Sequence, residues 1–236
     1  MNLNTKNDLH LLSNNLRDFL ISVSTSKKIA KGSYLFQEGM DAHELYLIKS
    51  GLVQVTKLTI DGDELSMQIC STNDIVGELT LYVDDAKYML NASALEEIEV
   101  YAINKEILEK EFSKNPPLAF EYMRWMGLHL QRIQSKIRDL VLNGKKGALY
   151  STLIRLSNSY GVQKKDGILI DLHLTNQDLA KFCATTRESV NRMLSDLRKR
   201  KIITMEASGK MLIHDLEPLR LEIGCENCPI EICNIF

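Results

Sequence analysis

Hydrophobic positions along the chain change their spacing several times, and each change predicts a different element. Leu9, Leu12, Leu16 and Phe19 recur at helical spacing, which predicts a short amphipathic helix near the start. From about residue 28 the apolar residues fall in short β-rich runs separated by glycines, at 33–36, 45–48, 53–55, 65–69 and 100–103. Asp61-Gly62 between two of these runs predicts a hairpin turn. Such strands are typical of a small antiparallel barrel or jelly roll.

The double proline Pro116-Pro117 marks the next boundary, and we expect a long helix after it. The apolar residues of this helix alternate in steps of four and three for about three heptads. A helix packed on its own barrel would also carry an apolar stripe, but a stripe this narrow favours a seam between two copies of the chain. The seam consists of Ala119, Met123, Met126, Leu130, Ile133, Ile137 and Leu140. Gly144 and Gly147 are expected to end or interrupt the helix.

The last third of the chain predicts a winged helix-turn-helix. A helix over 148–159 and a short strand over 168–170 precede two helices with a tight turn at 182–184. A hairpin over 202–205 and 211–213 follows them. Two capping sequences, Thr175 to Asp178 and Thr185 to Glu188, place the starts of the two helices.

The second of these helices has a polar face whose chemistry suits DNA bases. The guanidinium of Arg187 can fork onto guanine, and the carboxylate of Glu188 can accept from the amino group of cytosine. A polar helix face is by itself usually only a solvated face. Here, however, a capped helix precedes it, and a basic run over 198–201 and a wing follow it, and both can hold phosphates. The expected DNA contacts are Arg187, Glu188, Asn191, Arg192, Thr175, Thr186 and Lys199.

Three of the five cysteines lie within nine positions near the end of the chain, as Cys225, Cys228 and Cys233. The first two can reach one metal centre, and the third closes a pocket around it. Because nothing in the chain suggests an oxidising compartment, this pattern predicts metal or iron–sulfur ligation rather than a disulfide. A structural zinc and a thiol-disulfide switch through Cys225 and Cys228 are the alternatives. Cys70 and Cys183 are expected to be buried as small apolar residues.

Composition limits these possibilities only in part. The chain has 29 Lys and Arg against 31 Asp and Glu, so a DNA-binding surface must be local. No apolar stretch approaches the ~20 residues of a membrane span. The first residues lack the apolar core of a signal peptide, so we expect a cytoplasmic protein. An iron–sulfur enzyme would need a catalytic pocket or a second cluster motif, which the sequence does not suggest, and we therefore expect no enzymatic activity.

Two motifs resemble those of the Crp–Fnr family of bacterial transcription regulators. Residues 74–79, Asp-Ile-Val-Gly-Glu-Leu, are similar to the D-x-x-G-E-L turn of the family's barrel, and residues 187–192 are similar to its R-E-x-x-x-R reading helix. The resemblance covers nearly the whole chain and implies an α+β fold. Its parts are an N-terminal helical lead (1–27), a β-roll sensor-like domain (28–115), a dimerisation helix (116–143), a winged helix-turn-helix (144–214) and a C-terminal cysteine tail (215–236). It further implies a homodimer on a two-fold DNA site, with RNA polymerase as a partner.

The chain departs from the members of this family that bind cyclic nucleotides. Those members place an Arg-Ser pair shortly after the barrel turn to hold the phosphate and ribose. Here Asp84 and Asp85 stand near that place and would repel a phosphate. Lys87, the cation nearby, lacks the fork of an arginine. We therefore expect that the barrel binds no cyclic nucleotide.

The cysteine motif instead resembles that of the Fnr branch of Bacillus. This resemblance implies one oxygen-labile [4Fe-4S] cluster per subunit, held by Cys225, Cys228, Cys233 and an aspartate of the dimer helix, here Asp139. It also implies oxygen-responsive regulation of anaerobic genes, through an operator of the TGTGA…TCACA kind. Loss of the cluster would then free the tail and the two reading helices.

Residue chemistry alone leaves the fourth ligand open. A carboxylate is a hard, weakly matched ligand for iron. Without the resemblance Glu231 ranks above Asp139, which could equally be a solvated helix residue paired with Arg138 or a neighbouring lysine. The competing ligands are Glu226, Glu231, Asp215, His214 and the remaining cysteines.

Overall fold

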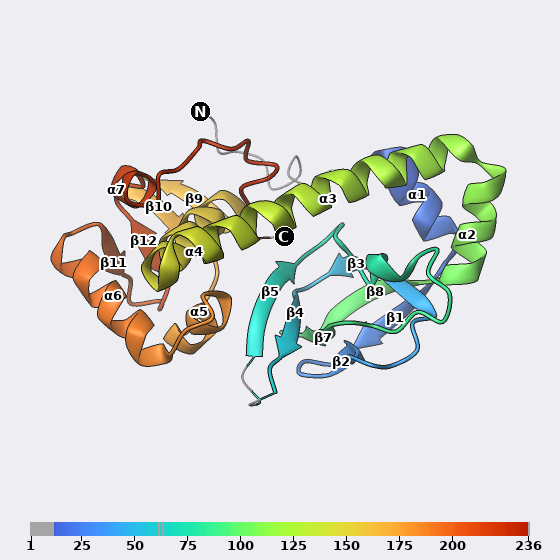
Figure 1. The fold of residues 1–236 in the computed structure, drawn as a ribbon, viewed down its shortest axis with the longest axis horizontal. Helices are drawn as coiled ribbons and strands as arrows, with labels where there is room; N and C mark the ends of the chain where they lie inside the picture. The colour runs from blue at the N-terminus through green and yellow to red at the C-terminus, as the bar shows by residue number, and fades with distance from the viewer. Residues whose placement is uncertain (1–11, 61, 63, 236) are drawn as a thin grey trace. The chain divides into compact units, whose positions relative to one another are not determined.

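The computed structural model describes residues 12–60, 62 and 64–235, which form two compact units (Figure 1). One unit contains the described residues up to Gly127, and the other runs from Leu128 to Ile235. Helix α3 (Pro116–Leu142) contributes its first part to the former unit and the remainder to the latter. Within the described chain, no helix combines the length and the apolar character that a membrane crossing requires.

The first unit contains two four-stranded sheets whose strands pair antiparallel. One has the order β1 (Ser24–Ile29), β8 (Ile98–Asn104), β3 (Glu44–Ser50) and β6 (Ile75–Val76). The other has the order β2 (Tyr34–Phe36), β7 (Asn91–Ala94), β4 (Val53–Leu58) and β5 (Glu64–Cys70). The five predicted runs are therefore confirmed as strands. The prediction missed β1, β6 and β7, which are polar or very short, because their pairing depends on neighbouring strands rather than on their own pattern.

Apolar residues of both sheets form the core of this roll. Val53, Ala92, Ile98 and Val100 are completely buried. A second cluster joins the sheet to α1 (Asn14–Ser22), α2 (Lys105–Lys114) and the start of α3, through residues such as Leu20, Leu108, Phe112 and Trp125. Helix α1 confirms the predicted helix near the start, although Leu9 lies outside the described residues. Asp61 of the predicted hairpin turn also lies outside them, but β4 and β5 do pair, with Leu58 opposite Glu64.

The second unit combines the end of α3 with a winged helix-turn-helix. Helix α4 (Gly144–Tyr160) is followed by β9 (Gly161–Lys164), β10 (Gly167–Ile170), α5 (Asn176–Phe182), α6 (Arg187–Lys199), β11 (Ile203–Met205), β12 (Met211–Ile213) and α7 (Glu217–Glu222). The four strands form one sheet in the order β11-β12-β10-β9. Of the two glycines expected to end the long helix, Gly144 lies at the break with φ of 58°, whereas Gly147 lies inside α4.

The caps of the two short helices differ in one respect from the prediction. Thr175 and Asp178 form the expected capping box of α5. The cap of α6 is Thr186, whose hydroxyl accepts from the backbone N–H of Ser189, so the predicted cap from Thr185 to Glu188 is wrong by one residue. Thr185 instead belongs to the turn, because its backbone N–H bonds to the carbonyl of Ala180 and its hydroxyl is buried.

Helix α3 carries a line of exposed apolar side chains. Met123, Leu130 and Ile137, all from the predicted seam, are 56%, 53% and 49% exposed. The seam residues between them, Met126, Ile133 and Leu140, are half-buried in their own units. Phe120 and Val141, which the prediction did not include, are exposed. The line therefore follows the heptad spacing of α3 but is broader at its ends than the predicted seam.

Candidate metal centre and nucleic-acid interface

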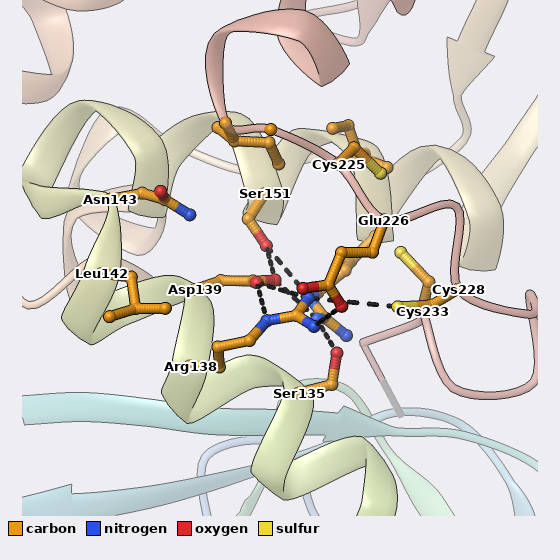
Figure 2. A pocket seen from close by; sticks show the side chains of 14 residues that line it. Ser135, Arg138, Asp139, Leu142, Asn143, Ser151, Cys225, Glu226, Cys228 and Cys233 are labelled. Atoms are coloured by element: carbon orange, nitrogen blue, oxygen red, sulfur yellow. Dashed lines mark hydrogen bonds and ion pairs between the residues drawn. The ribbon is translucent and has the colours of Figure 1, made fainter.

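The three tail cysteines and Asp139 line a single cavity of about 120 Å³ in the second unit (Figure 2). Asp139 comes from the last turns of α3, Ser151 and Arg155 come from α4, and the cysteines come from the segment after α7. Among the residues that the structure describes, no three His, Cys, Asp or Glu side chains are gathered closely enough to hold one metal ion. The three thiols share the lining of this cavity with Asp139.

Asp139 is buried and fully engaged. Its Oδ2 accepts from Nη2 of Arg155 at 2.7 Å and from the hydroxyl of Ser151 at 2.6 Å, and its Oδ1 accepts from Nη2 of Arg138 at 3.0 Å. Burial would raise the pKa of Asp139, but the bonds from Ser151 and Arg155, the charge of Arg155 and the bond from Arg138 together lower it. The expected alternative of a solvated residue is therefore wrong, whereas the pairing with Arg138 is confirmed.

Arg138 connects this carboxylate to the cysteine segment. Besides Asp139, its guanidinium donates to the carboxylate of Glu226 and lies 4.0 Å from Sγ of Cys228. Figure 2 shows the side chains of Arg138 and Glu226 pointing toward each other across the cavity. Two arginines, Arg138 and Arg155, therefore lie beside the candidate ligands.

The competing fourth ligands differ in where the structure places them. Glu226 lines the same cavity but is paired with Arg138. His214 bonds through its ring nitrogens to the hydroxyl of Thr204 and the carbonyl of Asp166, and Asp215 accepts from the backbone N–H of Glu217. Glu231 is half-buried, and the cavity lining does not include it. Asp139 is thus the buried carboxylate that this cavity shares with the thiols.

The donor set fits an iron–sulfur cluster. Thiolates are the usual ligands of such clusters, and each ligand binds a different iron, so the ligands can be spread around a cavity. A dipositive [4Fe-4S] core with three thiolates and one carboxylate would carry two net negative charges, which Arg138 and Arg155 would balance. A single zinc ion would instead require the cysteine segment to gather its thiols around one point.

The other two cysteines lie away from this cavity. Cys70 ends β5 in the core of the roll and is 1% exposed, and Cys183 is buried in the turn after α5, as the sequence predicted. The hydroxyl of Thr152 lies 3.7 Å from Sγ of Cys183, and burial raises the pKa of this thiol to about 11. Neither residue is placed to join the tail cysteines as a ligand.

Lys136 contacts the same turn from α3. Its Nζ lies 4.9 Å from the ring centre of Phe182, the last residue of α5. Burial and the nearby charge of Arg155 lower the pKa of Lys136 to about 7. A cation on α3 is therefore packed against the residue that precedes the turn into α6.

Helix α6 presents the predicted polar face to solvent. Val190, Leu194 and Leu197 are buried against the rest of the domain. Away from this stripe Glu188, Asn191, Arg192 and Lys199 are exposed, and Arg187 is exposed in the first turn of the helix. The buried stripe orients the helix, so these polar side chains point outward together, as a helix that enters the major groove requires.

Three of the expected DNA contacts have partners within the protein. The hydroxyl of Thr175 donates to Asp178 and caps α5, and the hydroxyl of Thr186 caps α6. The side-chain carbonyl of Asn191 accepts from the amide of Asn176 on α5 at 3.2 Å. The two caps fix the start of each helix, and the bond between Asn176 and Asn191 joins α5 to α6, which helps to hold the polar face of α6 in one orientation.

The roll contains a separate pocket of about 380 Å³. Phe36, Val55, Tyr88 and Leu90 are among the mostly apolar side chains that line it. Among the residues that line this pocket in the described part of the chain, the charged ones are Glu78, Asp85 and Lys87. Lys87 lies 3.7 Å from the carboxylate of Asp41. The pocket thus combines an apolar wall with more carboxylate than cationic groups.

A β-roll, a long helix with an exposed apolar line and a winged helix-turn-helix together define a DNA-binding transcription regulator with an N-terminal sensor-like domain. Residues 26–115 match the cyclic nucleotide-binding domain family, and residues 147–221 match the Crp-like helix-turn-helix domain family. The chain belongs to the Crp–Fnr family of transcription regulators.

Individual relatives agree with this assignment. The chain is 62% identical over 228 residues to the anaerobic regulatory protein of Bacillus subtilis, covering 97% of this chain and 96% of that protein. It is 30% identical to the lactate racemization regulatory protein of Lactiplantibacillus plantarum, over 86% of this chain and 92% of that protein. The structure of the c-di-GMP responsive regulator CLP of Xanthomonas campestris has the same fold, with a TM-score of 0.73 at 20% identity, covering 86% of this chain and 100% of that chain.

The sequence analysis missed Arg155 and Ser151 as parts of the site. Arg155 is the one charged residue between Leu149 and Tyr160 of a helix whose neighbouring residues are almost all buried. A charge in the middle of such a helix must find buried partners. A single charge in an otherwise uncharged stretch of helix was therefore the sequence signal that could have indicated Arg155.

Proposed function

We propose that the chain is an oxygen-responsive, DNA-binding regulator of anaerobic gene expression that carries a [4Fe-4S] cluster on Cys225, Cys228, Cys233 and Asp139. The observation that carries this proposal is the shared cavity, which brings three thiols to one buried carboxylate of α3. The name of the Bacillus subtilis relative, an anaerobic regulatory protein at 62% identity, supports the same conclusion.

Each residue of the site has a separate role in this proposal. The thiolates of Cys225, Cys228 and Cys233 supply soft ligands, and Asp139 supplies a hard one, which leaves one iron weakly held. Arg138 and Arg155 offset the negative charge of the ligands in a poorly solvated site. A bound cluster would supply a link that oxidants break. Because the ligands come from α3 and from the segment after α7, this link would join the dimer helix to the end of the DNA-binding unit.

The proposed DNA complex contains two copies of the chain. Burying the exposed apolar line of α3 against a second α3 would remove Met123, Leu130 and Ile137 from water. Two copies related by a two-fold axis would place their α6 helices in successive major grooves, about 34 Å apart. Arg187, Glu188 and Arg192 would then read an operator of the TGTGA…TCACA kind, with RNA polymerase as the further partner.

The test is to purify the protein without oxygen and to measure its absorption spectrum, iron, sulfide, zinc and operator binding. We expect a brown chromophore that air bleaches, four irons and four sulfides per chain, and tight binding only before bleaching. Cys228→Ala should lose the chromophore and the tight binding together. Cys70→Ser changes a cysteine in the core of the roll and is the matched control, which should keep both.

Two results would contradict the proposal. Stoichiometric zinc without a chromophore would assign the tail to a structural zinc site. Tight operator binding by Cys228→Ala would separate the cysteines from DNA recognition altogether.

A further inference from the structure

The C-terminal segment divides into two parts that different residues hold. We name residues 224–230 the cysteine loop, which contains Cys225 and Cys228, and residues 231–235 the docked end, which contains Cys233. The two parts differ in how many bonds they make to α3 and α4 and in how deeply they are buried.

The docked end is bonded to the helices at every residue. Arg132 of α3 donates to the carbonyl of Glu231 at 2.7 Å, and Asn158 of α4 donates to the carbonyl of Cys233 at 2.6 Å. Arg155 donates to the carbonyls of residues 232 and 234, at 3.1 and 3.4 Å. The backbone N–H of Ile235 donates to the hydroxyl of Ser159 at 2.9 Å. Asn234 and Ile235 are 3% and 2% exposed, so the bonds at these two residues are shielded from water, whereas those at residues 231–233 are partly buried.

Arg155 makes two of these five bonds and also bonds to side chains of α3 and α4. It is 1% exposed, and besides the two carbonyls it donates to Ser135 at 2.9 Å, to Asp139 at 2.7 Å and to Ser151 at 3.2 Å. One guanidinium thus joins α3, α4 and the docked end, and it uses its planar set of five N–H donors to do so. A lysine at this position would have three donors on one nitrogen and no planar fork, so it could not replace all five of these bonds.

The cysteine loop is held differently. Arg138 bonds the exposed carboxylate of Glu226 and lies near the sulfur of Cys228, and both Glu226 and Asn227 are exposed. The backbone N–H of Cys225 bonds to the carbonyl of Arg220 in the preceding helix. Exposed ion pairs of this kind contribute little to stability. The loop therefore opens at a lower free energy than the docked end.

We infer that Arg155 is a positioning residue that keeps the docked end, and with it Cys233, on α3 and α4 independently of any bound cluster. The bonds involved join protein groups, and Asp139 is the one candidate ligand whose ligating side chain takes part in them. Gain or loss of a cluster would then move the cysteine loop, while Cys233 and Asp139 stay in place as a preformed half-site. This is narrower than the sequence expectation that loss of the cluster frees the tail. The statement about the cluster rests on the proposed function, but the docking by Arg155 does not.

Hydrogen exchange of the full chain, kept reduced and with a chelator, tests the docking. We expect the amides of Ile232, Cys233 and Ile235 to exchange at least about tenfold more slowly than those of Glu226 to Cys228. Arg155→Lys should remove most of this difference by speeding the docked end. Arg138→Lys is the matched control, since it changes the other arginine of the site and should affect the cysteine loop alone. Equal exchange in the two parts of the wild-type chain, or equal loosening of the docked end by the two variants, would overturn the inference.

Two further measurements keep the outcomes distinct. Asn158→Ala removes the bond to the carbonyl of Cys233 without touching the buried charge, and it should speed exchange at the docked end even if Arg155→Lys fails to fold. The absorption spectrum of anaerobic wild-type protein tests the proposed function separately. If the amides of the docked end are protected from exchange in a chain that never forms a chromophore, the proposed cluster is contradicted. The positioning role of Arg155 is then still supported.

Discussion

The ion pair between Asp139 and Arg155 should contribute to stability before any ligand is considered, and Asp139→Asn tests this. The substitution keeps the shape of the side chain but removes its charge. It leaves the guanidinium of Arg155, whose side chain is 2% exposed, without its carboxylate at 2.7 Å. Breaking a buried pair by changing one partner costs about 3–5 kcal/mol. The effect should fall in this range because Asp139 is itself buried and its pKa is lowered.

A double-mutant cycle separates the pair from its surroundings. Arg155→Met should also destabilise the chain, and the double variant should be less destabilised than the sum of the two, with a coupling energy of about 1–3 kcal/mol. The measurement is urea unfolding followed by circular dichroism, with reductant and chelator present. Hydrogen exchange of the α4 amides reports the second unit by itself, since a chain of two units need not unfold in one step.

The matched control is Glu226→Gln, which breaks an exposed pair with Arg138 and should cost about 0–1 kcal/mol. If Asp139→Asn lowers the free energy of unfolding no more than Glu226→Gln does, the buried ion pair contributes no measurable stability. The reasoning about the pair between Asp139 and Arg155 would then be refuted. If the predicted cost is found, loss of a cluster in an Asp139 variant must be interpreted together with the stability of the second unit.

Three other predictions concern the remaining charged residues and the roll. Arg187→Ala should weaken operator binding by about 1–3 kcal/mol and relax the preference at one guanine, whereas Lys199→Ala should weaken binding to all sequences alike and flatten its salt dependence. Footprinting on operators varied at that guanine distinguishes the two effects. Equal discrimination by Arg187→Ala and wild type would show that Arg187 reads no base. Because the pKa of Lys136 is lowered to about 7, the unfolded chain binds more protons above that pH, so stability should rise from pH 7 to 8.5 in the wild type relative to Lys136→Met; a difference that stays constant with pH would contradict this. Calorimetry with cyclic AMP should detect no binding at millimolar ligand, since Asp85 and Glu78 line the pocket, and tighter binding would show that this charge argument fails.

Much of the fold could be predicted because its signals are local. Runs such as 45–48 and 53–55 have strand composition, and the buried stripe of α6 follows helical spacing. Strand β1, with the sequence Ser-Thr-Ser-Lys-Lys-Ile, carries no such signal and becomes a strand because it pairs with β8. The cap of α6 was misplaced by one residue because Thr185 has Glu188 three positions later, as the capping pattern requires, whereas Thr186, the residue that caps the helix, has Ser189 there.

The site was predictable only in part, for a similar reason. The spacing of the three cysteines is a local pattern, and it indicated the tail at once. Asp139 was named through a family resemblance, since residue chemistry alone favoured Glu231. The single charge of Arg155 in its stretch of α4 was a local signal, but its partners were not predictable, because its acceptors extend from Ser135, 20 residues before it, to Asn234, 79 residues after it. Such a centre exists only once α3, α4 and the end of the chain have come together.

The contact between Lys136 and Phe182 connects α3 to the end of α5, just before the turn into α6. Lys136 and Asp139 are three residues apart and so lie on neighbouring positions of one helical face. A helix turns as a rigid rod over so short a length, so any twist that repositions the carboxylate of Asp139 also swings the ammonium of Lys136 across the ring of Phe182. Arg187, five residues after Phe182 in the chain, begins α6. One helical turn, one aromatic ring and five residues of chain therefore separate the carboxylate of Asp139 from Arg187, the side chain that we propose reads a base.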